Sequence, residues 1–223
     1  MCCFLCLLHS NLKAHGCKCC RWFVNFAFIF AEITLNIYRM KGLVFTEFLG
    51  MVEEKFGFEV LDRLTSLPCL AEGAAYTSVG NYPHGDIFVM LDELHDAVGL
   101  PHKALIHAFS GWLFDAFHRI HPEFFAQIES SFDFLCGIDS VIHTEVRRLY
   151  TDARTPNFEA RRLSPDQMIM EYSSWRPFAD LAEGLILAAS LHFKEDVTID
   201  RQEGVTGDGR SARFVLTLSN QAS

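Results

Sequence analysis

The stretch IDSVIHTEVRRLY at residues 138–150, followed by EYSSWR at residues 171–176, decides how this chain is interpreted. In the first stretch, apolar residues at helical spacing surround His143, and a neutral imidazole in an apolar setting can bind a metal ion. In the second, a tyrosine, a serine and an arginine occupy alternate positions, so on an extended segment their side chains lie on one side. Arginine beside hydroxyl donors can bind paired carboxylates. Together the stretches meet the two requirements of a bound haem, an axial ligand for the iron and donors for the propionates.

Two further motifs extend this interpretation, MKGLVF at residues 40–45 and AEGL at residues 182–185. In this order and spacing, the four motifs make residues 40–223 resemble the haem nitric oxide/oxygen-binding (H-NOX) family. The resemblance implies a gas-sensing domain that binds haem b, with His143 as the proximal iron ligand. It also implies three residues at the propionate-binding positions: Tyr172, Ser174 and Arg176.

The resemblance also bears on which gas is bound. Oxygen-binding members of the family hold dioxygen through a distal tyrosine with polar neighbours. Here the matching position, nine residues after Tyr172, is Leu181, and the supporting positions are Phe48 and Leu113. All three are apolar, which implies that the pocket favours nitric oxide and excludes stable dioxygen. Pro156 stands where the family has a proline that presses on the porphyrin and distorts it.

Hydrophobic periodicity predicts an α+β domain. Seven helices are expected, at residues 43–56, 59–67, 86–98, 101–118, 122–135, 139–150 and 178–193. Four strands are expected, at residues 158–163, 168–174, 196–202 and 211–218. A helical N-terminal part therefore precedes a four-stranded antiparallel sheet with one inserted helix, and the resemblance puts haem between the two parts.

Local signals add detail to the helices. Asp86 and Asp139 are expected to cap the helices that begin beside them. Gly137 is expected to end the helix that precedes Asp139. Four apolar neighbours are expected to hold His143 against the core: Val141, Ile142, Val146 and Leu149.

Charge and cysteine content restrict the partners and the location of the domain. After the first 39 residues the chain carries 15 Lys and Arg against 27 Asp and Glu, a net charge of −12. Nucleic-acid surfaces require clustered cations, so this class of partner is excluded, whereas a basic protein partner is not. Six of the eight cysteines lie in the first twenty residues, which leaves Cys69 and Cys136. Two scattered cysteines form no disulfide framework, and a cytoplasmic location is therefore expected.

The first 39 residues differ from the rest of the chain. Residues 22–38 form an apolar run at the short end of the range for a membrane span, and Asn25, Glu32 and Asn36 interrupt it. A central carboxylate costs about 2.5–3.5 kcal/mol on insertion scales, so a membrane anchor is disfavoured. Because the resemblance begins at Met40, a start site assigned too early is favoured, with an amphipathic extension as an alternative.

The function expected from these features is a haem-based nitric oxide sensor, not an enzyme, that signals to a separate effector protein. The resemblance suggests a histidine kinase or a cyclic-di-GMP enzyme as the effector. The main alternative is a haem enzyme acting on peroxide or nitrogen oxides, but such chemistry normally needs a distal acid or base, which the three apolar distal positions do not offer. A third possibility is a domain that has lost haem and only binds a partner. The intact haem-binding positions argue against it.

Overall fold

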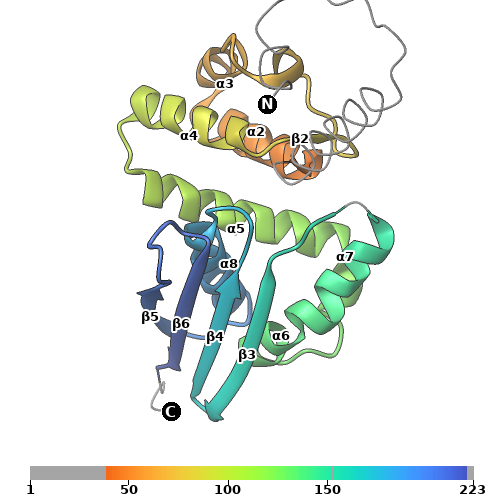
Figure 1. Ribbon diagram of the computed structural model, residues 1–223, viewed down its shortest axis with the longest axis vertical. Helices are drawn as coiled ribbons and strands as arrows, with labels where there is room; N and C mark the ends of the chain where they lie inside the picture. The colour runs from red at the N-terminus through yellow and green to blue at the C-terminus, as the bar shows by residue number, and fades with distance from the viewer. Residues whose placement is uncertain (1–38, 152, 220–223) are drawn as a thin grey trace, which may run out of the picture. The chain divides into compact units, whose positions relative to one another are not determined.

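The computed structural model describes residues 39–151 and 153–219, which belong to one compact unit, Tyr38–Ser223 (Figure 1). The apolar run at residues 22–38 and nearly all of the predicted N-terminal extension lie outside the described residues. Within the described ranges, no helix combines the length and the apolar character that a membrane span requires.

Four helices and a small antiparallel sheet build the N-terminal part of the unit. They are β1 (Arg39–Lys41), α2 (Gly42–Phe56), α3 (Phe58–Thr65), β2 (Asn81–Pro83), α4 (Gly85–Val98) and α5 (His102–Ile120). The four helices confirm the prediction to within about two residues, whereas β1 and β2 were not predicted. Gly99 ends α4 in the left-handed region with a φ of 72°, where glycine is favoured.

Asp86 has a different role from the predicted helix cap. It is the second residue of α4, and no side chain caps this helix. The carboxylate is buried and accepts hydrogen bonds from the Ala71 backbone N–H (3.0 Å) and the Tyr76 hydroxyl (2.7 Å). This carboxylate is bonded to the preceding loop, so it does not serve as the helix cap that was predicted. Asp86 therefore holds the preceding loop, with its short 3-10 helix η1 (Ala71–Ala74), against α4.

The single helix predicted at residues 122–135 is wrong. The chain forms a short 3-10 helix, η2 (Pro122–Phe124), and later a separate helix, α6 (Ser131–Gly137). Between them Gln127 takes a left-handed conformation with a φ of 69°, and Ser130 caps α6 through its side chain. The apolar spacing runs through this break, which is why periodicity alone did not reveal it.

The predicted break at Gly137 is also wrong. Gly137 has helical angles (φ −84°, ψ −9°), and the chain continues through a π-helix, η3 (Ile138–Ile142), into α7 (His143–Leu149). Asp139 consequently lies inside a continuous helical run and does not act as an N-cap. A π-helix is rare, and it changes which side chains face inward because its hydrogen bonds join residues five apart.

The C-terminal part is the predicted four-stranded antiparallel sheet, in the order β3-β4-β6-β5. Its elements lie within one residue of their predicted bounds: β3 (Asn157–Ser164), β4 (Gln167–Ser173), α8 (Ala179–His192), β5 (Val197–Glu203) and β6 (Ser211–Leu218). Alternate residues of the two central strands are buried on one face, including Met168, Met170 and Phe214. Helix α8 covers this face, behind β4 and β6 in Figure 1. The predicted α+β fold with an inserted helix is confirmed.

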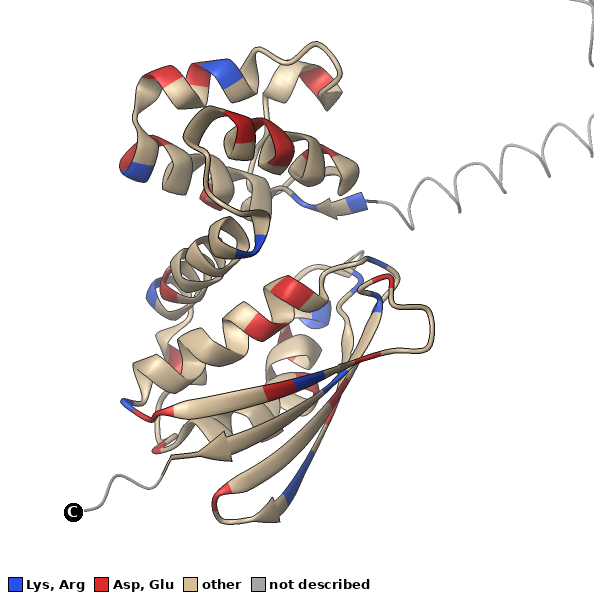
Figure 2. Ribbon diagram, turned by 90° about the vertical axis from the view of Figure 1, so that its left-hand side faces the viewer, with Lys and Arg blue, Asp and Glu red and all other residues tan. Residues whose placement is uncertain are grey.

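Acidic residues predominate on α2, α3 and α4 (Figure 2). These three helices carry nine Asp and Glu against two Lys and Arg. They therefore lack the clustered cations that a nucleic acid requires.

Helices α5 and α8 approach each other closely at Gly184. A Cβ atom at this position would lie 2.3 Å from Oγ and 2.7 Å from Cβ of Ser110 on α5. Gly→Ala in a helix interior normally stabilises by about 1 kcal/mol, but here overpacking is expected to make Gly184→Ala destabilising by roughly 1–3 kcal/mol. Urea unfolding measures the change. The control is Gly111→Ala on α5, where a Cβ would meet nothing within 4 Å. Equal stability of the two variants would contradict the close approach.

Candidate functional site

A cavity of about 350 Å³ lies among α5, α8, the η3–α7 segment and the end of β4. This volume falls in the range of small-molecule and cofactor sites. Much of the wall is apolar, with a few polar groups among the lining side chains, as is usual for such sites. The apolar lining includes Leu113, Phe117, Ile142, Val146 and Leu185.

His143, the first residue of α7, lines this cavity with a side chain that is 14% exposed. Its Nδ1 lies 3.2 Å from Oδ1 of Asp139, one turn earlier, so the carboxylate orients the ring. Burial lowers the pKa of His143, against the opposing effect of the hydrogen bonds with Asp139 and the Pro156 carbonyl. The imidazole is therefore neutral near pH 7, which is the form that ligates a metal.

The apolar support predicted for His143 is partly wrong. Ile142 is buried and Val146 packs against the core, and both line the cavity. Val141 and Leu149 are each 51% exposed. The π-helix alters the register of the side chains that face inward, and the predicted regular α-helix did not include this change.

Tyr172, Ser174 and Arg176 all line the same cavity, although they do not share one strand. Strand β4 ends at Ser173, so only Tyr172 belongs to it. The next residues form a turn in which Ser174 Oγ accepts a hydrogen bond from the Arg176 backbone N–H (3.1 Å). The turn thus keeps the two later side chains beside the first, as alternation on an extended segment predicted.

Among the described residues, Arg176 is a cavity side chain with a buried polar atom that makes no hydrogen bond. It is 8% exposed, and its guanidinium donates to the carbonyls of Arg154 (Nη1, 2.9 Å) and Arg39 (Nη2). Its Nε is buried with no hydrogen-bond partner among the described residues. Burial lowers the pKa of Arg176, but arginine remains charged in proteins. Burial raises the pKa of Tyr172, so its hydroxyl remains a donor. Such a set of donors is suited to an anion.

The remaining predicted residues divide between two cavities. Leu113, Pro156 and Leu181 line the large cavity. Phe48 does not: it is buried against Phe109, with 5.2 Å between ring centroids, and borders a separate cavity of about 50 Å³. Leu181 borders both. Phe48 therefore lies behind Leu181 rather than in the large cavity itself.

Sequence reasoning did not single out Lys41, Tyr150 and Arg154, which also line the large cavity. The Lys41 ammonium lies 5.2 Å from the centroid of the Tyr150 ring, a cation–π contact between residues far apart in the chain. Lys41 and Tyr150 stand inside two of the quoted motifs, and Arg154 lies four residues after the stretch that ends at Tyr150, but nothing in the pattern marked these three as cavity residues.

A neutral imidazole and an incompletely bonded guanidinium in one apolar cavity match what a bound haem requires. Haem needs one axial nitrogen beyond its own porphyrin ligands, and its two propionates are anions that need donors. Across residues 39–151 and 153–219, no three His, Cys, Asp or Glu side chains are placed to hold a metal ion by themselves. A single neutral imidazole beside donors for anions fits a metal that is carried by a macrocycle with acidic groups.

Comparison with known families agrees with this class of protein. A family model described as Haem-NO-binding matches residues 41–201, well over half of the chain. The chain therefore belongs to the Haem-NO-binding (H-NOX) family of haem-based gas sensors. Domains of this family are generally sensors rather than enzymes, and they often act through effector proteins.

Solved H-NOX structures share the fold over nearly their whole length. The unliganded Fe(II) protein from K. algicida is 28% identical (TM-score 0.77), covering 82% of this chain and 99% of that chain. The H-NOX from Shewanella woodyi, bound to IWP-051 in the Fe(II)CO state, is 36% identical (TM-score 0.71), covering 82% and 97%. An H-NOX from S. oneidensis in the Fe(II)NO state is 25% identical (TM-score 0.74), covering 81% and 100%. No curated protein matches the chain.

Proposed function

We propose that this protein senses nitric oxide through ferrous haem b, with residues 40–223 as the sensor domain. His143 would be the axial ligand. Three residues would bind the propionates: Tyr172, Ser174 and Arg176. The proposal is supported most directly by Arg176, a buried cation with an unsatisfied nitrogen, in the same apolar cavity as the neutral His143 imidazole.

The apolar distal residues support the choice of nitric oxide over dioxygen. Dioxygen on ferrous iron is held by a nearby hydrogen-bond donor, whereas nitric oxide binds tightly without one. Leu181 and Leu113 line the cavity, and Phe48 lies behind Leu181. The nearby Ser110 hydroxyl donates to the carbonyls of Ile106 (2.8 Å) and Leu181 (3.3 Å), so it is already engaged within the fold.

The helix that carries His143 supports a signalling role. When bound, haem would supply the iron site that nitric oxide occupies, and His143 would hold that iron. Because His143 is the first residue of α7, the packing of α7 would respond to the gas. The preceding π-helix, η3, is an element found frequently at functional sites, and a change in its register would give α7 a second packing.

The output would pass to a separate effector protein in the cytoplasm, for which a histidine kinase or a cyclic-di-GMP enzyme are the candidates. The acidic helices α2, α3 and α4 suit a basic docking surface on that partner. Cys69 and Cys136 are both free, which suits a reducing compartment. We propose no catalytic role, because the distal residues Leu113 and Leu181 supply no acid or base.

Gas selectivity is tested at Leu181. The ferrous wild-type protein is expected to keep its unliganded absorption spectrum in air and to change it with nitric oxide. Leu181→Tyr is expected to gain dioxygen binding weakly, because one hydrogen bond contributes only about 1 kcal/mol, roughly a fivefold gain in affinity. Leu181→Phe adds the aromatic ring without the hydroxyl, so it should gain no affinity for dioxygen. A stable dioxygen complex of the wild-type protein would refute this account of selectivity.

A further inference from the structure

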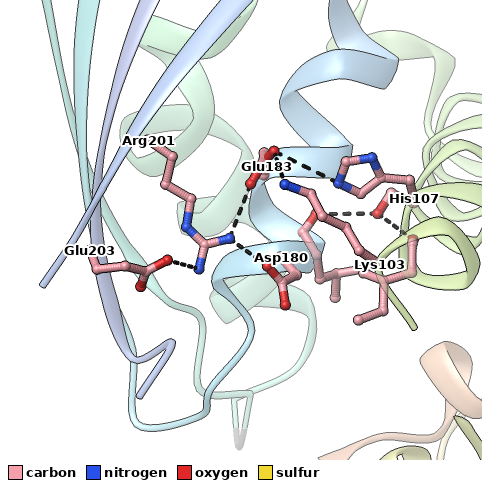
Figure 3. A network of polar contacts seen from close by, with 9 residues as sticks. Lys103, His107, Asp180, Glu183, Arg201 and Glu203 are labelled. Atoms are coloured by element: carbon pink, nitrogen blue, oxygen red, sulfur yellow. Dashed lines mark hydrogen bonds and ion pairs between the residues drawn. The ribbon is translucent and has the colours of Figure 1, made fainter. Parts of the chain in front are cut away.

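Figure 3 shows a network of charged side chains that joins α8 to α5 and β5. None of its members lines the large cavity. At its centre, Glu183 on α8 binds Lys103 of α5 (Nζ to Oε1, 2.8 Å) and Arg201 of β5 (Nη1 to Oε2, 3.0 Å). Arg201 also binds Asp180 and Glu203, the latter at 2.7 Å (Nη2 to Oε1). One carboxylate therefore connects three elements of the fold.

The two central members of this network, Glu183 and Arg201, are largely buried, so the loss of either charge is expected to be costly. Glu183 is 8% exposed, and the Arg201 side chain is 14% exposed. Burial by itself raises the pKa of Glu183, but hydrogen bonds from Lys103 and Arg201 outweigh it and lower the pKa, so the group is ionised. His107 Nε2 lies 3.9 Å from Glu183 Oε1 and is buried without a hydrogen bond among the described residues. Removal of one charge from a buried set leaves its partners uncompensated.

The network is joined to the distal residues through the backbone of both helices. Leu181 lies between Asp180 and Glu183 on one turn of α8, and its carbonyl accepts the Ser110 hydroxyl of α5 (3.3 Å). Leu113 lies one turn beyond Ser110 on α5. The two leucines that would face a bound gas thus stand on the two helices that Glu183 and Lys103 hold together.

We infer that Glu183 is the positioning residue of the distal pocket, which sets the separation of α5 and α8 and thereby the space left for a diatomic gas. This inference rests on the proposed haem function. The close approach at Gly184, next to Glu183, agrees with it, because the helices have no spare room there. Glu183 would act through Leu181 and Leu113 and would not touch the gas.

The test uses carbon monoxide as the probe of the ferrous protein. In Glu183→Gln, carbon monoxide is expected to associate about threefold faster or more, because residues without ligand contact can shift binding by this order. The infrared C–O stretching band should shift and broaden, since a looser pocket holds the probe in more than one arrangement. Gly184→Ala should move the band in the same direction, because it separates the helices without changing a charge.

Two controls separate positioning from general loss of stability. Glu171→Gln removes a carboxylate from an exposed pair with Arg213 on the sheet (2.6 Å) and should leave the rate and the band unchanged. Asp86→Asn removes a buried carboxylate that holds a loop to α4, so it should lower stability and still leave the band unchanged. In a double-mutant cycle, Lys103→Gln and Glu183→Gln should be non-additive.

The outcomes are distinguishable. The positioning role is overturned if Glu183→Gln keeps the wild-type rate of carbon monoxide association and the wild-type C–O band. It is also overturned if Asp86→Asn shifts the band as much as Glu183→Gln does. Either result leaves the haem proposal intact. If Glu183→Gln does not fold, Gly184→Ala and Lys103→Gln, whose lysine side chain is 58% exposed, decide the matter. A wild-type protein that binds neither haem nor carbon monoxide overturns the proposed function itself.

Discussion

Replacing His143 with glycine is expected to give a protein that holds haem only when imidazole is supplied. The substitution removes the proposed axial nitrogen and leaves space for a free imidazole, while the donors for the propionates remain. The absorption spectrum of the purified ferrous variant, with and without added imidazole, measures the effect. Retention of the full wild-type spectrum without imidazole would show that another group ligates the iron.

His121 offers a matched control for this experiment. It also lines the large cavity, but its Nδ1 pairs with Glu123 at 3.1 Å. His121→Gly should therefore keep the wild-type spectrum without imidazole. A dependence on imidazole in this variant instead would transfer the ligand role from α7 to the end of α5.

Arg176→Ala is expected to lose haem much faster than Arg147→Ala. The first variant leaves the propionates without a buried, charge-assisted donor, at a cost of about 1.5–3 kcal/mol or roughly 10- to 100-fold in retention. The second removes a guanidinium that is 43% exposed, donates to Thr155 and lies 3.8 Å from the Asp139 carboxylate. Such an exposed pair contributes under about 1 kcal/mol. Transfer of haem to an excess of a competing apoprotein measures both rates. Equal rates would contradict the propionate role.

The Arg176 side chain also donates to the carbonyls of Arg39 and Arg154, so it could have a purely structural role. Esterified haem distinguishes this role from binding of the propionates. With haem dimethyl ester, which lacks the anionic groups, the wild-type protein and Arg176→Ala should lose the cofactor at similar rates. Arg176→Lys should retain only part of the wild-type advantage with ordinary haem, because an ammonium lacks the planar fork of donors. A large difference that persists with the ester would mean that Arg176 only holds the loops of the cavity together.

The sequence by itself determined the class of fold and its family. Period-two alternation in the last strands and 3.6-residue spacing in the helices are local properties, so they predicted the sheet, the inserted helix α8 and most helix bounds correctly. The motifs around His143 and Tyr172 also predicted that these residues share one site. They do line one cavity, and their haem-binding roles stay predictions for the experiments above.

The tertiary structure decided what depends on contacts between distant segments. The break between η2 and α6, and the π-helix before His143, interrupt runs whose apolar spacing is unbroken, so periodicity could not reveal them. The sequence predicted Asp86 as a helix cap, but in the fold its carboxylate accepts a hydrogen bond from Tyr76 of the preceding loop. Glu183 stands in the AEGL motif, but the sequence did not reveal its ion pairs, because its partners Lys103 and Arg201 lie on other elements. A buried charge is tolerable only when such partners surround it, and it is folding that brings them together.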